Sequence, residues 1–106
     1  MYESMWSHSE KKLSRRVFEL ALEAELAEIV ADFKSKAAAV ATPEEMWALR
    51  EFLSHKQREI DQKYDYRYSQ LTFVFSRLLR EGRIRRDELH GLSEDKLSEI
   101  ERILSL

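Results

Sequence analysis

An all-α fold is predicted for this chain, first of all from its composition. The chain has 106 residues but only one proline and two glycines, too few for the turns of a β-rich or loop-rich protein. Hydrophobic residues make up 43% of it, and they recur every three or four positions, as on one face of a helix. We predict a single domain, with a helical stalk at about residues 8–65 and a helical head at about residues 66–106.

The first predicted helix spans about residues 8–41. Ser7 and Glu10 have the spacing of a capping box, in which each side chain binds a free backbone amide at the helix start. No glycine or proline interrupts the chain over this range. Its apolar residues form one stripe, made of Phe18, Leu22, Leu26, Ile29, Phe33, Ala37 and Val40. We therefore expect one face of this helix to be covered.

The second predicted helix starts at the sequence TPEE. Thr42 is a candidate cap, Pro43 suits the first helical position, and Glu45 completes a second capping box. Helical spacing then continues through the apolar residues Met46, Leu49, Leu53, Ile60, Tyr64, Tyr68, Leu71, Phe75 and Leu78. We therefore predict one helix that ends at Gly82 as its C-terminal cap, in preference to the strand that the alternating sequence YDYRY would suggest. A bend near residues 62–66 is compatible with this pattern.

The last part of the chain predicts a short turn and one more helix. The turn lies at about residues 87–90, and Gly91 is a second candidate capping glycine. Ser93 is a candidate cap for the final helix, and Glu94 and Asp95 suit its positive N-terminal end.

The length of the first predicted helix indicates an assembly of two chains. A helix from about residue 8 to 41 is roughly 50 Å long at 1.5 Å per residue, whereas a compact globule of this size has a diameter of roughly 34 Å. One helical hairpin would leave much of its apolar stripe in water, and pairing two hairpins into a four-helix bundle would cover it. We therefore predict a homodimer, with Leu49, Phe52, Leu53 and Ile60 in the core of the stalk.

Three aromatic residues are predicted to lie off the apolar stripes. At 100° per residue, Trp47 lies about 140° from the middle of its stripe, and Tyr66 and Phe73 lie roughly 165° from theirs. Polar residues surround Trp47, which favours a protein-contact anchor, since tryptophan is enriched in interface hot spots. For Phe73, burial under a second helix or a partner chain is an equally good interpretation. Tyr66 is compatible with an ordinary surface tyrosine.

The sequence contains no recognisable active site, and we predict a protein that is not an enzyme. It has no cysteine, which excludes disulfides, thiol chemistry and sulfur-ligated zinc, and no glycine-rich phosphate loop. His55 lies four residues from both Glu51 and Glu59, so three potential metal ligands would share one helical face. This spacing is common by chance. We therefore expect neither a metal nor another cofactor.

The charge pattern disfavours nucleic acid as a partner. The chain has 18 basic and 20 acidic residues, interleaved, with a formal net charge of −2. One basic cluster could meet phosphates or an acidic protein, or be an ordinary helix end, and it comprises Arg77, Arg80, Arg83, Arg85 and Arg86. Nucleic-acid binding is therefore the less favoured alternative.

The ends and the apolar runs of the chain predict its cellular location. The opening sequence MYESMWSHSEKK lacks the apolar core of a signal peptide, and no later run is long enough to span a bilayer. The absence of cysteine fits a reducing compartment. We therefore expect a cytoplasmic protein without an integral membrane segment.

The block MWALREFLSHKQREIDQKYDYRYSQLTFVFSRLLREG, residues 46–82, carries a more specific signal. It is similar to the central segment of the fluorescence recovery protein family of cyanobacteria. The matching positions are Trp47, Leu49, Phe52, Leu53, Ser54, Lys56, Glu59, Ile60, Asp61, Lys63, Tyr64, Asp65, Arg67, Phe73, Val74, Phe75, Leu78, Leu79, Glu81 and Gly82. Shorter matches before and after the block fall in register without gaps, so the resemblance covers nearly the whole chain.

The resemblance implies both a fold and a function. The fold is an all-α homodimer with a stalk of paired long helices and a head built from the C-terminal helices. The function is non-enzymatic: such a protein binds the light-activated orange carotenoid protein, favours its return to the resting form and ends energy quenching at the phycobilisome. Unequal affinity for two states of the partner suffices for this. A location at the periphery of the thylakoid membrane is compatible with this role.

The resemblance also implies which residues bind the partner. The family's surface combines a tryptophan, an acidic residue and basic residues near the dimer interface with a phenylalanine on the head, and Trp47, Glu51 and Phe73 occupy these positions. Glu51 stands where the family typically has Asp and Arg50 where it has His. Gln57 replaces an Arg, which removes a charge and a bidentate donor. The alternative is a divergent relative with the same dimeric fold that binds a different partner protein.

Overall fold

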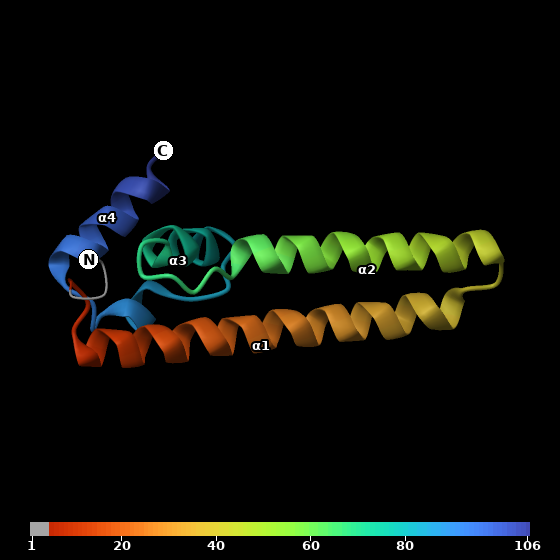
Figure 1. Cartoon of the computed structure of the whole chain (residues 1–106), viewed down its shortest axis with the longest axis horizontal. Helices are drawn as coiled ribbons and strands as arrows, with labels where there is room; N and C mark the ends of the chain where they lie inside the picture. Colours follow the sequence, from red (N-terminus) through yellow and green to blue (C-terminus); the bar gives the residue numbers. More distant parts are fainter. Residues whose placement is uncertain (1–4) are drawn as a thin grey trace.

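In this computed structural model, which describes residues 5–106, the chain forms a long two-helix hairpin with smaller helices gathered at its open end (Figure 1). The elements are α1 (His8–Ala39), α2 (Pro43–Lys63), α3 (Leu71–Arg80), the short 3-10 helix η2 (Arg86–Leu89) and α4 (Glu94–Leu104). Between residues 5 and 106 the chain has no strand. The all-α prediction is confirmed.

Helix α1 begins with the predicted capping box. The Ser7 hydroxyl accepts a hydrogen bond from the Glu10 amide at 3.1 Å, and the Glu10 carboxylate accepts one from the Ser7 amide at 2.9 Å. The helix ends at Ala39, two residues before the predicted end. Local side-chain chemistry therefore sets the start of this helix.

Helix α2 begins at Pro43 after the cap Thr42, as predicted, but its capping box is only half formed. The Thr42 hydroxyl accepts a hydrogen bond from the Glu45 amide at 3.2 Å. The Glu45 carboxylate, however, accepts from the Ala41 amide at 3.1 Å and from the Thr42 hydroxyl, not from the Thr42 amide. The Glu45 side chain therefore binds the backbone amide one residue before the one that it binds in the standard capping box.

The prediction of one continuous helix up to Gly82 is wrong, because residues 64–70 are not helical. Alternate residues of a non-helical segment can face the same side, and here Tyr64 and Tyr66 both stand edge-on against Phe18 of α1, with ring centres 5.4 and 4.8 Å away. The Tyr68 ring lies 5.6 Å from the Trp6 ring, centre to centre, with the two planes tilted at 42°. Packing against α1 outweighs helix propensity, and the alternation in YDYRY was the informative signal.

The apolar core lies at the open end of the hairpin, around α3 and α4 (Figure 1). Its buried members come from both ends of the sequence and are Trp6, Val17, Phe18, Ala21, Leu71, Val74, Phe75, Leu78, Ile84, Leu89, Leu92 and Ile100. The first half of α1 is therefore part of this core, together with the C-terminal helices. The predicted division into stalk and head at residues 65 and 66 stays a prediction.

Away from this core the two long helices run side by side to the turn that joins them (Figure 1). The molecule measures 54 × 24 × 23 Å and its radius of gyration is 17.0 Å, against about 13 Å for a compact domain of this length. Large apolar side chains are exposed along the hairpin, namely Leu26, Val30, Phe33, Met46, Trp47 and Leu53. The expected elongation is confirmed. Within residues 5–106, no helix is long and apolar enough to cross a membrane.

The two glycines have different structural roles. Gly82 has φ +73° and ends α3, as a C-terminal cap should. Gly91 does not have a positive φ, so its prediction as a second cap of this kind is wrong. A Cβ atom at Gly91 would lie 2.6 Å from Cδ1 of Leu13, so this glycine lets the chain approach α1 closely.

Ser93 precedes α4 as predicted, but its side chain does not cap the helix. Its backbone amide instead donates to Oε2 of Glu10 in α1 at 2.8 Å. The start of α4 is therefore capped by a side chain of α1 and not by its own Ser93.

Candidate functional site

Trp47 and Glu51 lie one turn apart on the exposed face of α2. Trp47 is 53% exposed and the Glu51 side chain 70%. Arg50 links them: its guanidinium lies 5.4 Å from the Trp47 ring centre and 3.6 Å from the Glu51 carboxylate. Gln57 is exposed further along the same helix. An exposed indole beside an arginine has the composition of a protein interface hot spot.

Phe73 is presented by α3, whose other face is buried in the core. Leu71, Val74 and Phe75 are at most 5% exposed, whereas Phe73 is 49% exposed. No second helix of the described chain therefore covers this ring. Trp47 and Phe73 lie on different elements, at different parts of the elongated molecule (Figure 1).

Tyr66 does not lie on the surface with Phe73, so that prediction is wrong. Its ring packs on Phe18, the Arg15 guanidinium lies 3.9 Å from the ring centre, and its hydroxyl donates to the Lys11 carbonyl at 3.4 Å. Burial, together with the neighbouring Tyr68 hydroxyl, raises the pKa of Tyr66 to about 12. Tyr66 therefore belongs to the packing of the core.

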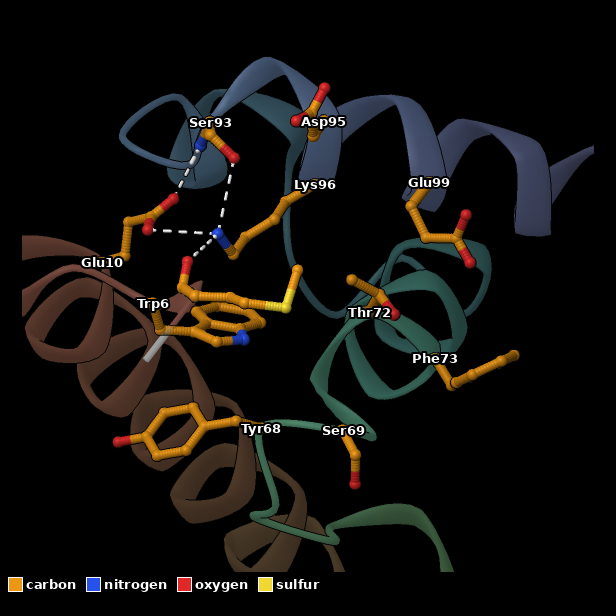
Figure 2. Close-up of a pocket in the computed structure, with 11 residues that line it drawn as sticks. Trp6, Glu10, Tyr68, Ser69, Thr72, Phe73, Ser93, Asp95, Lys96 and Glu99 are labelled. Atoms are coloured by element: carbon orange, nitrogen blue, oxygen red, sulfur yellow. Dashed lines mark hydrogen bonds and ion pairs between the residues drawn. The ribbon is translucent and has the colours of Figure 1, made fainter. Parts of the chain in front are cut away.

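A groove of about 540 Å³ opens beside Phe73 (Figure 2). Trp6 is one of its apolar lining residues, and Figure 2 shows Glu10 at one end with Glu99 and Phe73 at the other. The Lys96 ammonium reaches over the Trp6 ring, 4.8 Å from its centre, and donates to the Met5 carbonyl at 2.8 Å and to Glu10 at 3.2 Å.

The hydrogen bonds around Glu10 favour the ionised form of its carboxylate. Burial alone would raise its pKa, but hydrogen bonds from the Ser7 and Ser93 amides and from Lys96 outweigh burial and lower the pKa. The carboxylate and the Lys96 ammonium therefore form a charged pair beside an apolar wall. Sequence reasoning missed this groove because its walls come from three distant segments; its one signal was Trp6, which belongs to the shorter matches to the family that precede residue 46.

A buried ionic cluster joins the hairpin to the helices at its open end. We call it the junction cluster; its members are Glu25 of α1, Lys63 and Tyr64 at the end of α2, and Glu81 and Arg83 around Gly82. The Tyr64 hydroxyl donates to Glu25 at 2.8 Å. Burial and this hydrogen bond raise the pKa of Tyr64 above its usual range. No sequence pattern predicted this cluster.

Each arginine of the basic cluster binds a carboxylate or a backbone carbonyl of the same chain. The contacts are Arg77 with Glu81 at 3.0 Å, Arg80 with the Ile103 carbonyl at 3.3 Å, Arg83 with Glu28 at 3.0 Å, Arg85 with Asp87 at 3.0 Å and Arg86 with Glu101 at 2.7 Å. These pairs neutralise most of its charge, which disfavours phosphate binding.

The acidic and histidine residues of α2 do not form a metal centre. The His55 imidazole lies 3.1 Å from the Glu59 carboxylate, one turn along the helix. Throughout residues 5–106, no group of three His, Asp or Glu side chains is arranged to hold a metal ion.

Comparison with known proteins supports the helical geometry. A sequence model of the family described as "Photoprotection regulator fluorescence recovery protein" matches residues 6–104. The chain belongs to this family. The fluorescence recovery protein of Synechocystis sp. (strain PCC 6803) is 38% identical over 104 residues, which cover 98% of this chain and 95% of that protein.

Solved structures of the family have the same fold. The fluorescence recovery protein of Fremyella diplosiphon superposes with a TM-score of 0.87 at 42% identity, over 94% of this chain and 97% of that one. The Synechocystis protein superposes with a TM-score of 0.89 at 38% identity, over 95% and 99% of the two chains. The chain is therefore a photoprotection regulator with the helical fold of the fluorescence recovery proteins.

Proposed function

We propose that this chain is a non-enzymatic regulator that binds the photoactivated orange carotenoid protein, speeds its return to the resting form and so ends phycobilisome quenching. Membership of the family supports this proposal. The observation that carries it is the exposure of Trp47 and Phe73, two large aromatic residues at the family's binding positions. The regulator would act in the cytoplasm, at the periphery of the thylakoid membrane.

The active form in this proposal is a homodimer. In a single hairpin Leu53 is 37% exposed, and Leu49, Phe52 and Ile60 are only half-buried. The neighbouring exposed residues Leu26, Val30, Phe33 and Met46 extend this apolar surface. Apolar patches of this kind on soluble proteins usually mark contact sites. A second copy packed along the stalk would cover them, and sedimentation at micromolar concentration is expected to give a dimer. A stable folded monomer would contradict this part of the proposal.

The proposed mechanism needs only differential binding. A regulator that binds the converting form of its partner more tightly than the active form lowers the barrier between them. Each tenfold acceleration requires about 1.4 kcal/mol of such preference. An exposed indole and phenyl ring, with the Glu51–Arg50 ion pair, can supply this through contacts alone.

The test is to mix the protein with photoactivated orange carotenoid protein and follow the recovery of its orange colour in the dark. Acceleration is expected, and Trp47→Ala and Phe73→Ala are each expected to reduce it about tenfold or more, as loss of a hot spot does. Leu20→Ala is the matched control, because Leu20 is 52% exposed but lies on α1 outside the proposed surface. If both aromatic variants behaved as the control does, the proposed surface would be wrong.

A different partner protein is the second candidate function, and the residues at positions 50 and 57 favour it. Gln57 lacks the charge and the paired donors of the arginine found there in the family. A folded protein that leaves colour recovery unchanged would support this alternative. Capture of the carotenoid protein alone from the native host would exclude it.

A further inference from the structure

The groove beside Phe73 carries an uneven charge. Four of its lining residues carry a formal charge: Glu10, Asp95, Lys96 and Glu99. Lys96 and Glu10 neutralise each other, and their side chains are only 13% and 8% exposed. Asp95 and Glu99 remain on the α4 side (Figure 2). Glu99 is paired with Arg102 at the surface, 2.7 Å away, and within residues 5–106 Asp95 has no ion pair.

The other lining residues are the serines and threonine Ser69, Thr72 and Ser93 and a set of large apolar or aromatic side chains. Met5 is 65% exposed and Phe73 49%, while Trp6 is 5% exposed. Tyr68 continues this surface between Trp6 and α3. A ligand in the groove would therefore meet apolar side chains on one side and two carboxylates on the other.

We propose that this groove binds a segment of the partner protein in which an apolar side chain stands beside an arginine or a lysine. The apolar side chain packs on Met5 and Phe73, and the cation pairs with Asp95 and Glu99. This inference rests on the proposed function, because Phe73 belongs to both surfaces, and it adds the charge of the segment that the head recognises.

Charge complementarity decides between a basic and an acidic segment. An acidic segment would place like charges beside Asp95 and Glu99, which costs free energy. Lys96 does not offset this, because its ammonium is held by Glu10 and the Met5 carbonyl. A basic segment needs only to displace Arg102, which is 59% exposed, from a surface ion pair of small stability.

The two tryptophans of the chain allow the groove to be tested without a natural partner. Trp6 lines the groove and Trp47 lies on the stalk, so their indole N–H signals in an NMR spectrum of the 15N-labelled protein report separately. The probes are two capped peptides, Arg-Leu-Arg and Glu-Leu-Glu, at millimolar concentration. Arg-Leu-Arg is expected to shift the Trp6 signal and leave the Trp47 signal unchanged. Equal shifts with both peptides, or no shift with either, would overturn the inference.

Neutralising the carboxylates gives the second measurement. Asp95→Asn with Glu99→Gln is compared with Glu94→Gln and Glu101→Gln, which remove the same charge from α4 outside the groove. The first pair is expected to abolish the Trp6 shift and to weaken binding of photoactivated orange carotenoid protein about fivefold at low salt. The control pair is expected to change neither. Equal effects of the two pairs would show that only net charge matters and would overturn the inference.

The two arms separate this inference from the proposed function. A protein that binds Arg-Leu-Arg at Trp6 but has no affinity for the carotenoid protein would contradict the proposed function and support binding of a basic segment in the groove. A protein that binds the carotenoid protein but shows no shift of the Trp6 signal would support the proposed function and overturn the inference about the groove.

Discussion

The ammonium of Lys63 lies 2.7 Å from a carboxylate oxygen of Glu81, and this ion pair ties the end of α2 to the end of α3. Lys63 also pairs with Glu25 of α1 at 2.7 Å, so one side chain that is only 4% exposed holds three helices together. Transfer of these charges from water is costly, and the pairs roughly offset it. The junction cluster therefore fixes geometry more than it adds stability.

Replacing Lys63 should nevertheless be strongly destabilising, because Glu25 and Glu81 lose the most buried of their cations and keep only their arginine pairs. We expect Lys63→Met to lower the free energy of unfolding in urea by about 3 kcal/mol. Lys56→Met is the control: Lys56 forms a more exposed pair with Glu59 at 3.7 Å, and the expected loss is below about 1 kcal/mol. Equal losses would mean that Arg83 alone suffices to pair with Glu25 and Glu81.

Tyr64 and Tyr66 allow the contribution of a single tyrosine hydroxyl to the free energy of unfolding to be compared at two similar sites. Both rings stand edge-on to Phe18, and phenylalanine would keep that contact in either place. The Tyr64 hydroxyl donates to a carboxylate at 2.8 Å, whereas that of Tyr66 donates to a carbonyl at 3.4 Å. Tyr64→Phe should therefore cost about 2 kcal/mol of unfolding free energy and Tyr66→Phe less than about 1 kcal/mol. Chemical denaturation checks this, and a reversed order would contradict it.

The raised pKa of Tyr66 predicts a loss of stability in alkali. An unfolded tyrosine loses its proton near pH 10, whereas the folded Tyr66 keeps it up to about pH 12. Between these values the folded state binds more protons, so its stability falls as the pH rises. The slope of unfolding free energy against pH in this window should be shallower in Tyr66→Phe than in the wild type. An unchanged slope would show that Tyr66 titrates normally.

The lowered pKa of Glu10 predicts a loss of stability in acid. The unfolded glutamate takes up a proton near its usual value of 4.5, whereas the folded one stays ionised to lower pH. The stabilisation from Glu10 is thus complete above this value and is lost as the pH falls through the folded pKa. Glu10→Gln should flatten the acid limb of the stability curve, and Glu23→Gln, at an exposed site on the same helix, should not. Identical acid limbs for the two variants would refute this.

Several helix ends and the helix faces were predicted well from the sequence, whereas the caps predicted at Gly91 and Ser93 did not form. Ser7 with Glu10, Pro43 and Gly82 act on their own backbone, so a few neighbouring residues determine the outcome. The exposure of Trp47 was also predictable, and so was the position of Phe73 off the apolar stripe, although burial of Phe73 under another helix was an equal alternative. Each lies within one uninterrupted helix, and the phase of that helix decides which way a side chain points.

The features that the sequence did not predict depend on residues far apart in the chain. The break at residues 64–70 is set by Phe18, whose ring receives Tyr64 and Tyr66, so a helical pattern in those residues alone was misleading. The groove and the junction cluster each need side chains from three segments. Pairwise contacts over such separations have no local periodicity to reveal them.

The attachment of α4 to the start of α1 has a consequence for the order in which the protein folds. The hydrogen bond from Ser93 to Glu10 spans 83 residues, and that from Lys96 to Met5 spans 91. During synthesis the hairpin can form as soon as α2 has emerged, but the core stays open until α4 follows. Contacts of this sequence separation slow folding. The nascent chain therefore leaves Trp6 without its cover from Lys96 until α4 leaves the ribosome, and chaperones have that interval in which to bind it.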